Sequence, residues 1–185
     1  MATSKREQLV QTAFELFSRE GYHATGIDRI LAESGVAKMT LYKHFKSKDE
    51  LIVAVLEQRR LHMLEVMGET LHGLGPREAL LAVFDRIHEM ISQEHFCGCL
   101  FIHAAAEFHD REHSIHREAA LQKALTEAHF LRCLEGLQAP QPERLARQLQ
   151  FLMEGAMAMA HVMGPGNQAL EAKAAAEQLL AAAGV

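Results

Sequence analysis

The stretch TGIDRILAESGVAKMTLYKHF, residues 25–45, predicts two short helices joined by a tight turn. Apolar residues recur at helical spacing in each half, and they are Ile27, Ile30 and Leu31, then Val36, Leu41 and Phe45. Thr25, with Asp28 three residues later, is a signal for the start of a helix, and Gly35 can take the positive φ that ends one. The two apolar edges can then face a single core.

The second of these helices leaves mostly polar side chains free, which suits a helix that lies in a DNA major groove. The next helix begins near Lys48, and its free N–H groups and positive dipole end favour a phosphate there. We therefore expect contacts with phosphates and base edges. The candidate DNA-binding residues are Thr25, Lys38, Met39, Thr40, Tyr42, Lys43, His44 and Lys48.

A longer stretch, AFELFSREGYHATGIDRILAESGVAKMTLYKHFKSKDEL, resembles the DNA-binding head of the tetracycline-repressor (TetR) family of bacterial regulators. The residues that carry the resemblance are Phe14, Phe17, Gly21-Tyr22, Gly35-Val36, Leu41-Tyr42, His44-Phe45 and Ser47-Lys48. Ala37 departs from it, since the family usually has Ser or Thr there to cap the recognition helix, and a lost cap costs about 1 kcal/mol. The alternative reading is an ordinary helical hairpin.

Composition favours an all-α protein with about nine helices. The chain has 185 residues, 49% of them hydrophobic, with only four Pro and 12 Gly. We expect an N-terminal three-helix helix-turn-helix domain at residues 1–47. A helical effector-binding and dimerisation domain is expected at residues 48–185. Its helices are predicted at about 48–72, 76–92, 98–108, 114–137, 142–163 and 167–183.

The charge distribution supports a nucleic-acid partner at one end of the chain, although the net charge is −5. Residues 1–60 hold 10 Lys and Arg against 8 Asp and Glu, and the remaining residues hold 9 against 16. No signal peptide or membrane-spanning apolar run is evident, and the three Cys do not form a secreted disulfide framework. These features predict a cytoplasmic protein with no membrane partner.

The last two predicted helices carry broad apolar faces that suggest association of two chains. The residues of these faces are Leu145, Leu149, Leu152 and Ala156, then Leu170, Ala174, Leu179 and Leu180. The resemblance implies a homodimer, and symmetric half-sites would give a small head its selectivity. The alternative is that these faces close the chain's own core.

Signatures of catalysis and of cofactor binding are missing, so neither an enzyme nor a cofactor is predicted. Histidines gather in the middle of the chain, and the spacing of His109, His113 and His116 is compatible with a Zn²⁺ or Ni²⁺ site. Because no fixed ligand spacing is matched, we favour a solvated polar turn and predict no metal.

Two cysteines, Cys97 and Cys99, lie too close for an ordinary intramolecular disulfide. They could serve with His95 as soft metal ligands or as an oxidant-sensing thiol. The segment Gly-Cys-Leu-Phe and the following Ala-Ala-Glu-Phe also resemble a stretch found in one branch of TetR-like proteins, which favours a structural Cys99. We interpret Cys133 as a core residue.

A small-molecule effector site among the later helices is implied by the resemblance to the TetR family. The candidate residues are His62, Met63, Met67, Phe84, His88, Phe101, Glu107, Met153, Met157 and His161. Methionine provides an adaptable lining, although a Met stripe at helical spacing is more often core. The helix beginning near Lys48 is expected to be the only element that links the head to the rest.

The sequence thus predicts a homodimeric transcriptional regulator, a repressor that a small molecule releases from operator DNA. Two alternatives remain open. One is a metal- or thiol-redox-sensing regulator that uses the Cys97, Cys99 and His cluster. The other is a helical enzyme that merely carries the DNA-binding head.

Overall fold

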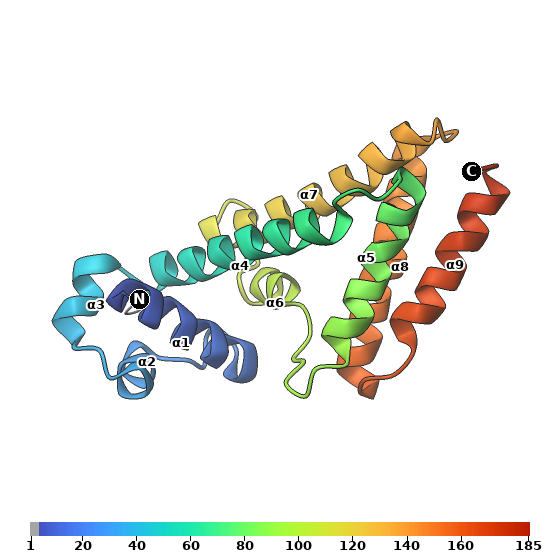
Figure 1. The fold of residues 1–185 in the computed structure, drawn as a ribbon. Helices are drawn as coiled ribbons and strands as arrows, with labels where there is room; N and C mark the ends of the chain where they lie inside the picture. Colours follow the sequence, from blue (N-terminus) through green and yellow to red (C-terminus); the bar gives the residue numbers. More distant parts are fainter. Residues whose placement is uncertain (1–3) are drawn as a thin grey trace. The chain divides into compact units, whose positions relative to one another are not determined.

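The computed structural model describes residues 4–185, and in that range the only regular elements are helices (Figure 1). Their bounds are α1 Lys5–Glu20, α2 Ile27–Ser34, α3 Lys38–His44, α4 Lys48–Leu71, α5 Pro76–Ile91, α6 Leu100–Glu107, α7 Ser114–Gly136, α8 Pro142–Met163 and α9 Gln168–Ala182. The all-α prediction is confirmed for these residues. The bounds of α4 to α9 lie within two residues of those expected from the sequence.

The chain divides into two compact units. The first, here called the head unit, comprises Met1–Met63 and Leu100–Gln122, and the second, the body unit, comprises Leu64–Cys99 and Lys123–Val185. The domain boundary expected after residue 47 falls inside the head unit, so the division into a DNA-binding and an effector-binding domain stays a prediction. Residues 1–3 of the predicted DNA-binding domain lie outside the described range. Two helices, α4 and α7, continue from one unit into the other. The sequence had suggested that α4 is the only link, and that expectation was wrong.

Helix α1 begins with a capping box formed by Ser4 and Glu7. The Ser4 hydroxyl accepts a hydrogen bond from the Glu7 N–H at 3.2 Å, and the Glu7 carboxylate accepts one from the Ser4 N–H at 2.8 Å. The helix ends at Gly21, whose φ of 85° lies in the region that favours glycine. The buried face of α1 is Leu9, Val10, Ala13, Leu16 and Phe17.

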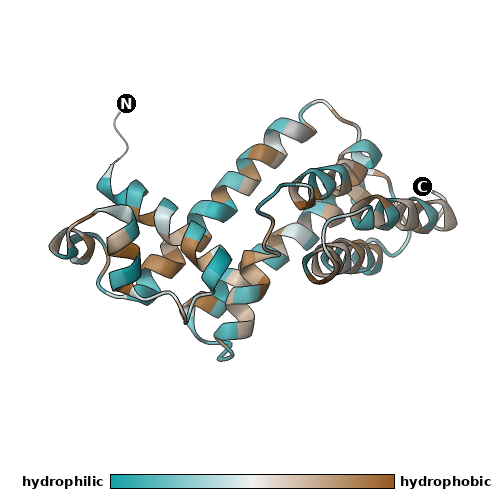
Figure 2. Ribbon diagram, turned by 90° about the horizontal axis from the view of Figure 1, so that it is seen from below, coloured by the Kyte–Doolittle hydropathy of each residue, from teal (hydrophilic) through white to brown (hydrophobic). Residues whose placement is uncertain are grey.

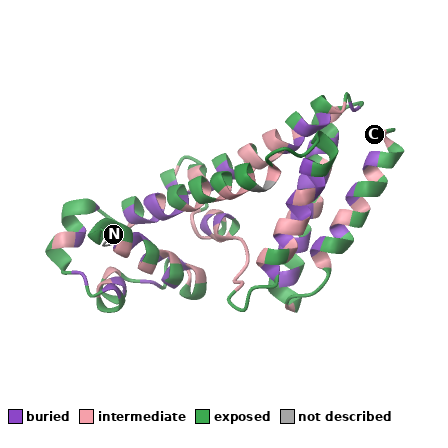
Figure 3. Ribbon diagram, viewed as in Figure 1, coloured by how far each residue is buried: buried purple, intermediate pink, exposed green. Residues whose placement is uncertain are grey.

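Helix α4 starts with a cap of its own and buries its first turns. The Ser47 hydroxyl accepts a hydrogen bond from the Glu50 N–H at 3.1 Å, and the Glu50 carboxylate accepts one from the Lys46 N–H at 2.6 Å. The buried residues that follow are Leu51, Ile52, Val55 and Leu56. Figure 3 shows the purple of buried residues in the first turns of α4. Each such side chain stabilises the head unit by about 1.5–3 kcal/mol.

The core of the body unit lies among α5, α8, α9 and the end of α7. Its fully buried members include Leu80, Phe84, Ile91, Phe130, Leu134, Ala146, Leu149, Ala169, Ala176 and Leu180. An ion pair adds to the packing of α9 on α5, because Lys173 Nζ lies 2.7 Å from an Asp85 carboxylate oxygen. Among residues 4–185, every helix is too short or too polar to cross a membrane.

The apolar face predicted for association on α8 is buried within the chain itself. Leu145, Leu149 and Ala156 are 8%, 0% and 6% exposed and belong to the body-unit core. The prediction was wrong for these residues because helical spacing alone does not say which apolar stripe faces the chain's own core. On α9, the predicted Leu170 and Ala174 are exposed, whereas the exposed large apolar side chains of α8 differ from those predicted and are Phe151, Met159, Val162 and Met163. Figure 2 draws α8 and α9 with hydrophobic and hydrophilic residues interspersed.

Candidate nucleic-acid interface

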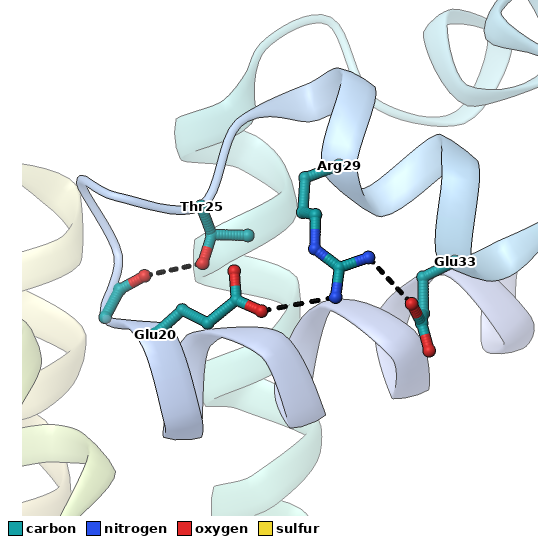
Figure 4. A network of polar contacts seen from close by, with 5 residues as sticks. Glu20, Thr25, Arg29 and Glu33 are labelled. Carbon is teal, nitrogen blue, oxygen red and sulfur yellow. Dashed lines mark hydrogen bonds and ion pairs between the residues drawn. The ribbon is translucent and has the colours of Figure 1, made fainter.

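The loop before α2 is closed by the buried side chain of Thr25. Its hydroxyl donates to the Gly21 carbonyl at 2.7 Å, and the residue is 0% exposed (Figure 4). Helix α2 is instead preceded by Gly26, without a side-chain cap. The capping role predicted for Thr25 was therefore wrong, because the hydroxyl is used to close the α1–α2 loop. The same burial removes the Thr25 side chain from the candidate DNA-binding surface.

Helix α2 is tied to the end of α1 by the guanidinium of Arg29. One of its nitrogens lies 2.7 Å from a Glu33 carboxylate oxygen, and another lies 3.3 Å from Glu20 (Figure 4). The hydrogen bond to Glu33, followed by the charges of Glu33 and Glu20, raises the pKa of Arg29 against the effect of burial. These contacts orient α2 on α1 without using any residue of α3.

The turn between α2 and α3 has the geometry expected of Gly35. Its φ of 63° and ψ of 14° are left-handed, and its N–H donates to the Leu31 carbonyl at 3.0 Å. The preceding Ser34 is buried, and its carbonyl accepts a hydrogen bond from the Gln8 side chain of α1 at 2.8 Å. The turn is thus fixed from both sides, which sets the direction of α3.

Helix α3 packs through Leu41 and leaves its other faces in solvent (Figure 3). Ala37 precedes it without a side-chain cap, as the sequence predicted. Met39 is 84% exposed and Tyr42 46% exposed. Lys38, Lys43 and His44 are also exposed, while Thr40 is half-buried. Met39, Thr40, Tyr42 and Lys43 line one surface depression of about 460 Å³.

Two of the candidate lysines already have partners in the head unit. Lys38 Nζ lies 3.1 Å from an Asp28 carboxylate oxygen, and both side chains are exposed. Lys48 is half-buried and donates to the His23 carbonyl at 3.4 Å, and burial lowers its pKa against the charges of Glu107 and Asp49. Exposed pairs of this kind contribute little to stability, so Lys38 can exchange Asp28 for a phosphate at small cost.

Glu107, which the sequence placed in the effector site, instead holds α6 against the α1–α2 loop. Its carboxylate oxygens accept hydrogen bonds from the N–H groups of Tyr22 at 2.8 Å and His23 at 2.6 Å. At the other end of α6, the Leu100 carbonyl accepts a hydrogen bond from the Tyr22 hydroxyl at 3.0 Å. The effector assignment of Glu107 is corrected, since both oxygens are already engaged. Spacing along the sequence could not have placed residue 107 beside residue 22.

The segment after α6 extends this contact through aromatic rings. The Phe108 ring lies 4.8 Å from the His23 ring and 5.0 Å from the His113 ring, between centroids. His116 Nδ1 donates to the Phe108 carbonyl at 2.8 Å, and His113 Nε2 lies 3.4 Å from an Asp49 carboxylate oxygen. His113 and His116 are thus half-buried and make contacts within the head unit, whereas residues 109–112 are exposed, as expected of a polar turn.

The structure does not bring the central histidines and cysteines into one ligand set. Among residues 4–185, no three side chains of His, Cys, Asp or Glu are grouped as a metal ion would require. The Cys97 thiol donates to the His95 carbonyl at 3.4 Å, whereas Cys99 lies beside Lys123. Cys133 is 8% exposed and belongs to the body-unit core, as predicted.

The remaining candidate effector residues are divided between the two units. His62, Met63 and Phe101 belong to the head unit, and Met67, Phe84, His88, Met153, Met157 and His161 belong to the body unit. Phe84, Phe101, Met153 and Met157 are buried, with Phe84, Met153 and Met157 in the body-unit core, while His62 and His161 are exposed. Met63, Met67 and His88 are half-buried, and the His88 Nδ1 atom is buried without a hydrogen-bond partner.

Comparisons with known proteins agree with this geometry. Residues 9–55 match the family described as bacterial regulatory proteins, tetR family. The chain is similar to SCO4454, a TetR-family transcriptional regulator from Streptomyces coelicolor. The two are 30% identical, the match covers 97% of this chain and 95% of that one, and the TM-score is 0.92. The TetR-type regulator sav143 from Streptomyces avermitilis is 32% identical over 99% of this chain and 100% of its own, with a TM-score of 0.88.

A further relative is similar over part of its length. The HTH-type transcriptional activator FasR from Mycolicibacterium smegmatis is 50% identical over 91 residues, which are 49% of this chain and 42% of that protein. The aligned stretch thus spans less than half of that curated relative. Because the match to SCO4454 extends over nearly the whole of both chains, the identity of the fold does not rest on the head alone. This chain belongs to the TetR family of DNA-binding transcriptional regulators.

Proposed function

We propose that this chain binds operator DNA through α3 and represses transcription there until a small molecule releases it. The observation that carries the proposal is the exposed face of α3, on which Met39, Thr40, Tyr42 and Lys43 line one depression. A helix of this kind, presented by a preceding helix and a tight turn, is the recognition element of helix-turn-helix proteins. The proposal includes no catalytic step and no cofactor, and it places the protein in the cytoplasm with its DNA.

The side chains on α3 differ in what they can recognise. Lys43 and His44 stand in its last turn, where a positive charge suits phosphate, and Lys38 and Lys48 flank them. Thr40 and Tyr42 carry hydroxyl groups that can bond base edges. Met39 is apolar and 84% exposed, which suits contact with the methyl group of thymine in the major groove. We assign phosphate contacts to the cations and base contacts to Met39, Thr40 and Tyr42.

We further propose that two copies associate through the exposed apolar residues of α8 and α9. Phe151 and Val162 are 70% and 75% exposed, and they stand eleven residues apart, on the same face of α8. Met159 and Met163 on α8 and Leu170 on α9 are exposed as well. Exposed apolar side chains gathered on one face of a helix are characteristic of an interface. A two-fold dimer would present two α3 helices to symmetric half-sites, which gives selectivity that one small head lacks.

The effector is proposed to bind in the body unit against His88 and Met67. A buried nitrogen without a partner, such as His88 Nδ1, is an atom that a ligand or a water could satisfy. Met67 is half-buried on the part of α4 that lies in the body unit and packs against its core. Because α4 and α7 both continue into the head unit, a ligand that prefers one arrangement of these helices can shift the DNA-binding equilibrium.

Selection of binding sites from a random pool of DNA duplexes tests the central proposal. The full chain should enrich a sequence made of two inverted half-sites, and Lys43→Ala should bind the enriched duplex more weakly. Transcription in vitro from a promoter that carries this site then decides between repression and activation. Failure to enrich any sequence, with a folded and dimeric protein, would contradict the assignment of α3. Increased transcription would leave DNA binding intact but overturn repression.

A thermal-shift screen of small organic molecules tests the effector site. A compound that raises the melting temperature of the parent should also release the enriched duplex. The response should be weakened in His88→Leu, which removes the buried nitrogen while it retains an apolar side chain. Arg132→Ala, an exposed change elsewhere in the body unit, serves as the control. A compound that acts equally on the parent and on His88→Leu would place the site elsewhere.

A further inference from the structure

A lysine, a cysteine and a glutamate meet inside the body unit. Lys123 Nζ on α7 lies 3.2 Å from Cys99 Sγ and 2.6 Å from a carboxylate oxygen of Glu154 on α8. The Lys123 and Glu154 side chains are only 26% and 17% exposed. Gln150 also fixes this part of α7, because its side-chain amide donates to the Lys123 carbonyl at 3.0 Å. The amine of Lys123 is thus held in contact with the thiol of Cys99, because α8 fixes the part of α7 that carries Lys123.

The charges in this cluster depend on one another. Burial opposes the positive charge of Lys123, but negative charge on Cys99 and on Glu154 outweighs it, so the pKa of Lys123 is raised. The second carboxylate oxygen of Glu154 is buried without a hydrogen-bond partner. It can therefore accept a proton from the neighbouring ammonium group. If the negative charge on Cys99 were lost, the largest of the effects that raise the pKa of Lys123 against burial would be lost with it.

We propose that Cys99 and Lys123 form an oxidative modification site, in which a peroxide converts the contact between thiol and amine into a covalent sulfur–nitrogen bond. This site goes beyond the proposed DNA-binding function and does not rest on it. The thiolate is the nucleophile in such chemistry, and an adjacent ammonium group stabilises it. Sulfenic acids condense with nearby nitrogen atoms, and here a nitrogen already lies at contact distance.

The reaction has two balanced steps. First, the Cys99 sulfur attacks one oxygen of hydrogen peroxide, the O–O bond breaks, and the thiol and peroxide become a sulfenic acid and water. Sulfur is oxidised by two electrons and the peroxide is reduced by two. Second, Lys123 passes a proton to Glu154 and its neutral amine attacks the sulfenic sulfur. The S–OH bond breaks as the S–N bond forms, and the departing hydroxide takes one proton from the attacking nitrogen and leaves as water. Glu154 then releases its proton to solvent and is a carboxylate again.

The other cysteines lack this arrangement. The Cys97 thiol donates to the His95 carbonyl, and no lysine contact is found for it among the described residues. Cys133 is buried, and burial raises the pKa of its thiol against the effect of Arg132, which disfavours the reactive thiolate. The main competing reaction is therefore a disulfide between Cys97 and Cys99, which would also remove two hydrogen atoms. Cys97 thus has to be removed in one arm of the test.

Mass spectrometry of the full chain after treatment with hydrogen peroxide tests the site. The parent should lose two hydrogen atoms, about 2 Da, and a thiol reductant should restore its mass. After digestion with trypsin, the peptide with Cys99 should be linked to the one with Lys123, and cleavage after Lys123 should fail. Cys97→Ser should behave like the parent. Lys123→Arg, made together with Cys97→Ser, keeps a positive charge beside Glu154 but has no amine to react, so it should gain oxygen atoms instead of forming the link.

Three outcomes would overturn the proposal. Loss of the 2-Da change in Cys97→Ser would identify a disulfide between the two cysteines. Persistence of the link in Lys123→Arg would exclude Lys123 as its nitrogen. A parent protein that only gains oxygen atoms would show that the sulfenic acid reacts with further peroxide before the amine. Circular dichroism of each variant establishes that it is folded, so each arm gives a result for or against the link.

Discussion

Glu107 on α6 accepts a hydrogen bond from the backbone N–H of Tyr22 at 2.8 Å, although 85 residues separate them in the chain. The same carboxylate binds the next amide, and Tyr22 itself donates from its hydroxyl to the first residue of α6. Both ends of α6 are therefore bonded to the loop that positions α2 and α3. A helix that lies outside the helix-turn-helix in sequence is part of what orients it.

Replacement of Glu107 by Gln should destabilise the head unit. The amide has one acceptor oxygen in place of two, so a backbone N–H loses its charged partner, which costs about 1–3 kcal/mol. Urea denaturation measures this change in the free energy of unfolding. Glu112→Gln alters an exposed carboxylate in the following turn and is the matched control. Equal stability of the two variants would show that the contact contributes nothing.

Alanine at Gly21 should be destabilising for two separate reasons. The residue has a φ of 85°, and an added Cβ would lie 3.1 Å from a Glu107 carboxylate oxygen. Its ψ of 166° places it in a region that is essentially confined to glycine, which alone costs about 1–3 kcal/mol for an L-residue. Gly68→Ala should have the opposite sign, stabilising the chain by about 0.5–1 kcal/mol, because Gly68 lies inside α4 with nothing within 4 Å of an added Cβ. Thermal denaturation of both variants tests the contrast.

Two substitutions on α3 should separate phosphate contact from base recognition. Lys43→Ala should weaken binding to every duplex and reduce the slope of log affinity against log salt by about 1, because one phosphate contact is lost. Thr40→Ala should instead relax the base preference at one position of each half-site. Salt titrations with selected and scrambled duplexes measure both effects. If neither variant differs from the parent, α3 does not enter the groove through this face.

A charge at Phe151 should separate the proposed dimer without unfolding the chain. The side chain is 70% exposed in the single chain, so Phe151→Asp removes no core contact but buries an unpaired carboxylate in the dimer. Sedimentation should then give monomers, and specific DNA binding should be lost. Leu61→Asp, at an apolar residue of α4 that is 54% exposed, is the control. A dimeric Phe151→Asp protein would place the interface elsewhere.

Stability should fall on acidification partly because of His129. Burial, with the charge of Arg132, lowers the pKa of His129 below its usual 6.5, against a smaller effect of a hydrogen bond to Ala79. The unfolded chain therefore binds a proton at His129 more readily than the folded chain does. The contribution of neutral His129 to stability is complete above about pH 6.5 and declines as the pH falls through that value. His129→Gln should lose less stability than the parent between about pH 7 and pH 5. Urea denaturation at each pH provides the comparison, and parallel pH profiles would contradict it.

The sequence by itself determined the local elements, because their causes are local. Helical spacing of apolar residues and the left-handed Gly35 both act within one or two turns of chain, and each was predicted correctly. Ala37 was also predicted to lack a cap bond. The exposed face of α3 followed in the same way, since the positions of Leu41 and Phe45 fix which side chains remain free.

Only the tertiary structure decided which partner each remaining side chain meets. Thr25 carries a hydroxyl that can cap a helix, but in the fold this hydroxyl is buried and donates to the Gly21 carbonyl at 2.7 Å. Leu149 belongs to an apolar stripe, and the packing of α5 and α9 on α8 directed that stripe inward. Glu107 could have faced a ligand, but the fold brought the backbone N–H groups of Tyr22 and His23 to it. Contacts between residues far apart in the chain depend on how helices pack, and no pattern within a single helix specifies that.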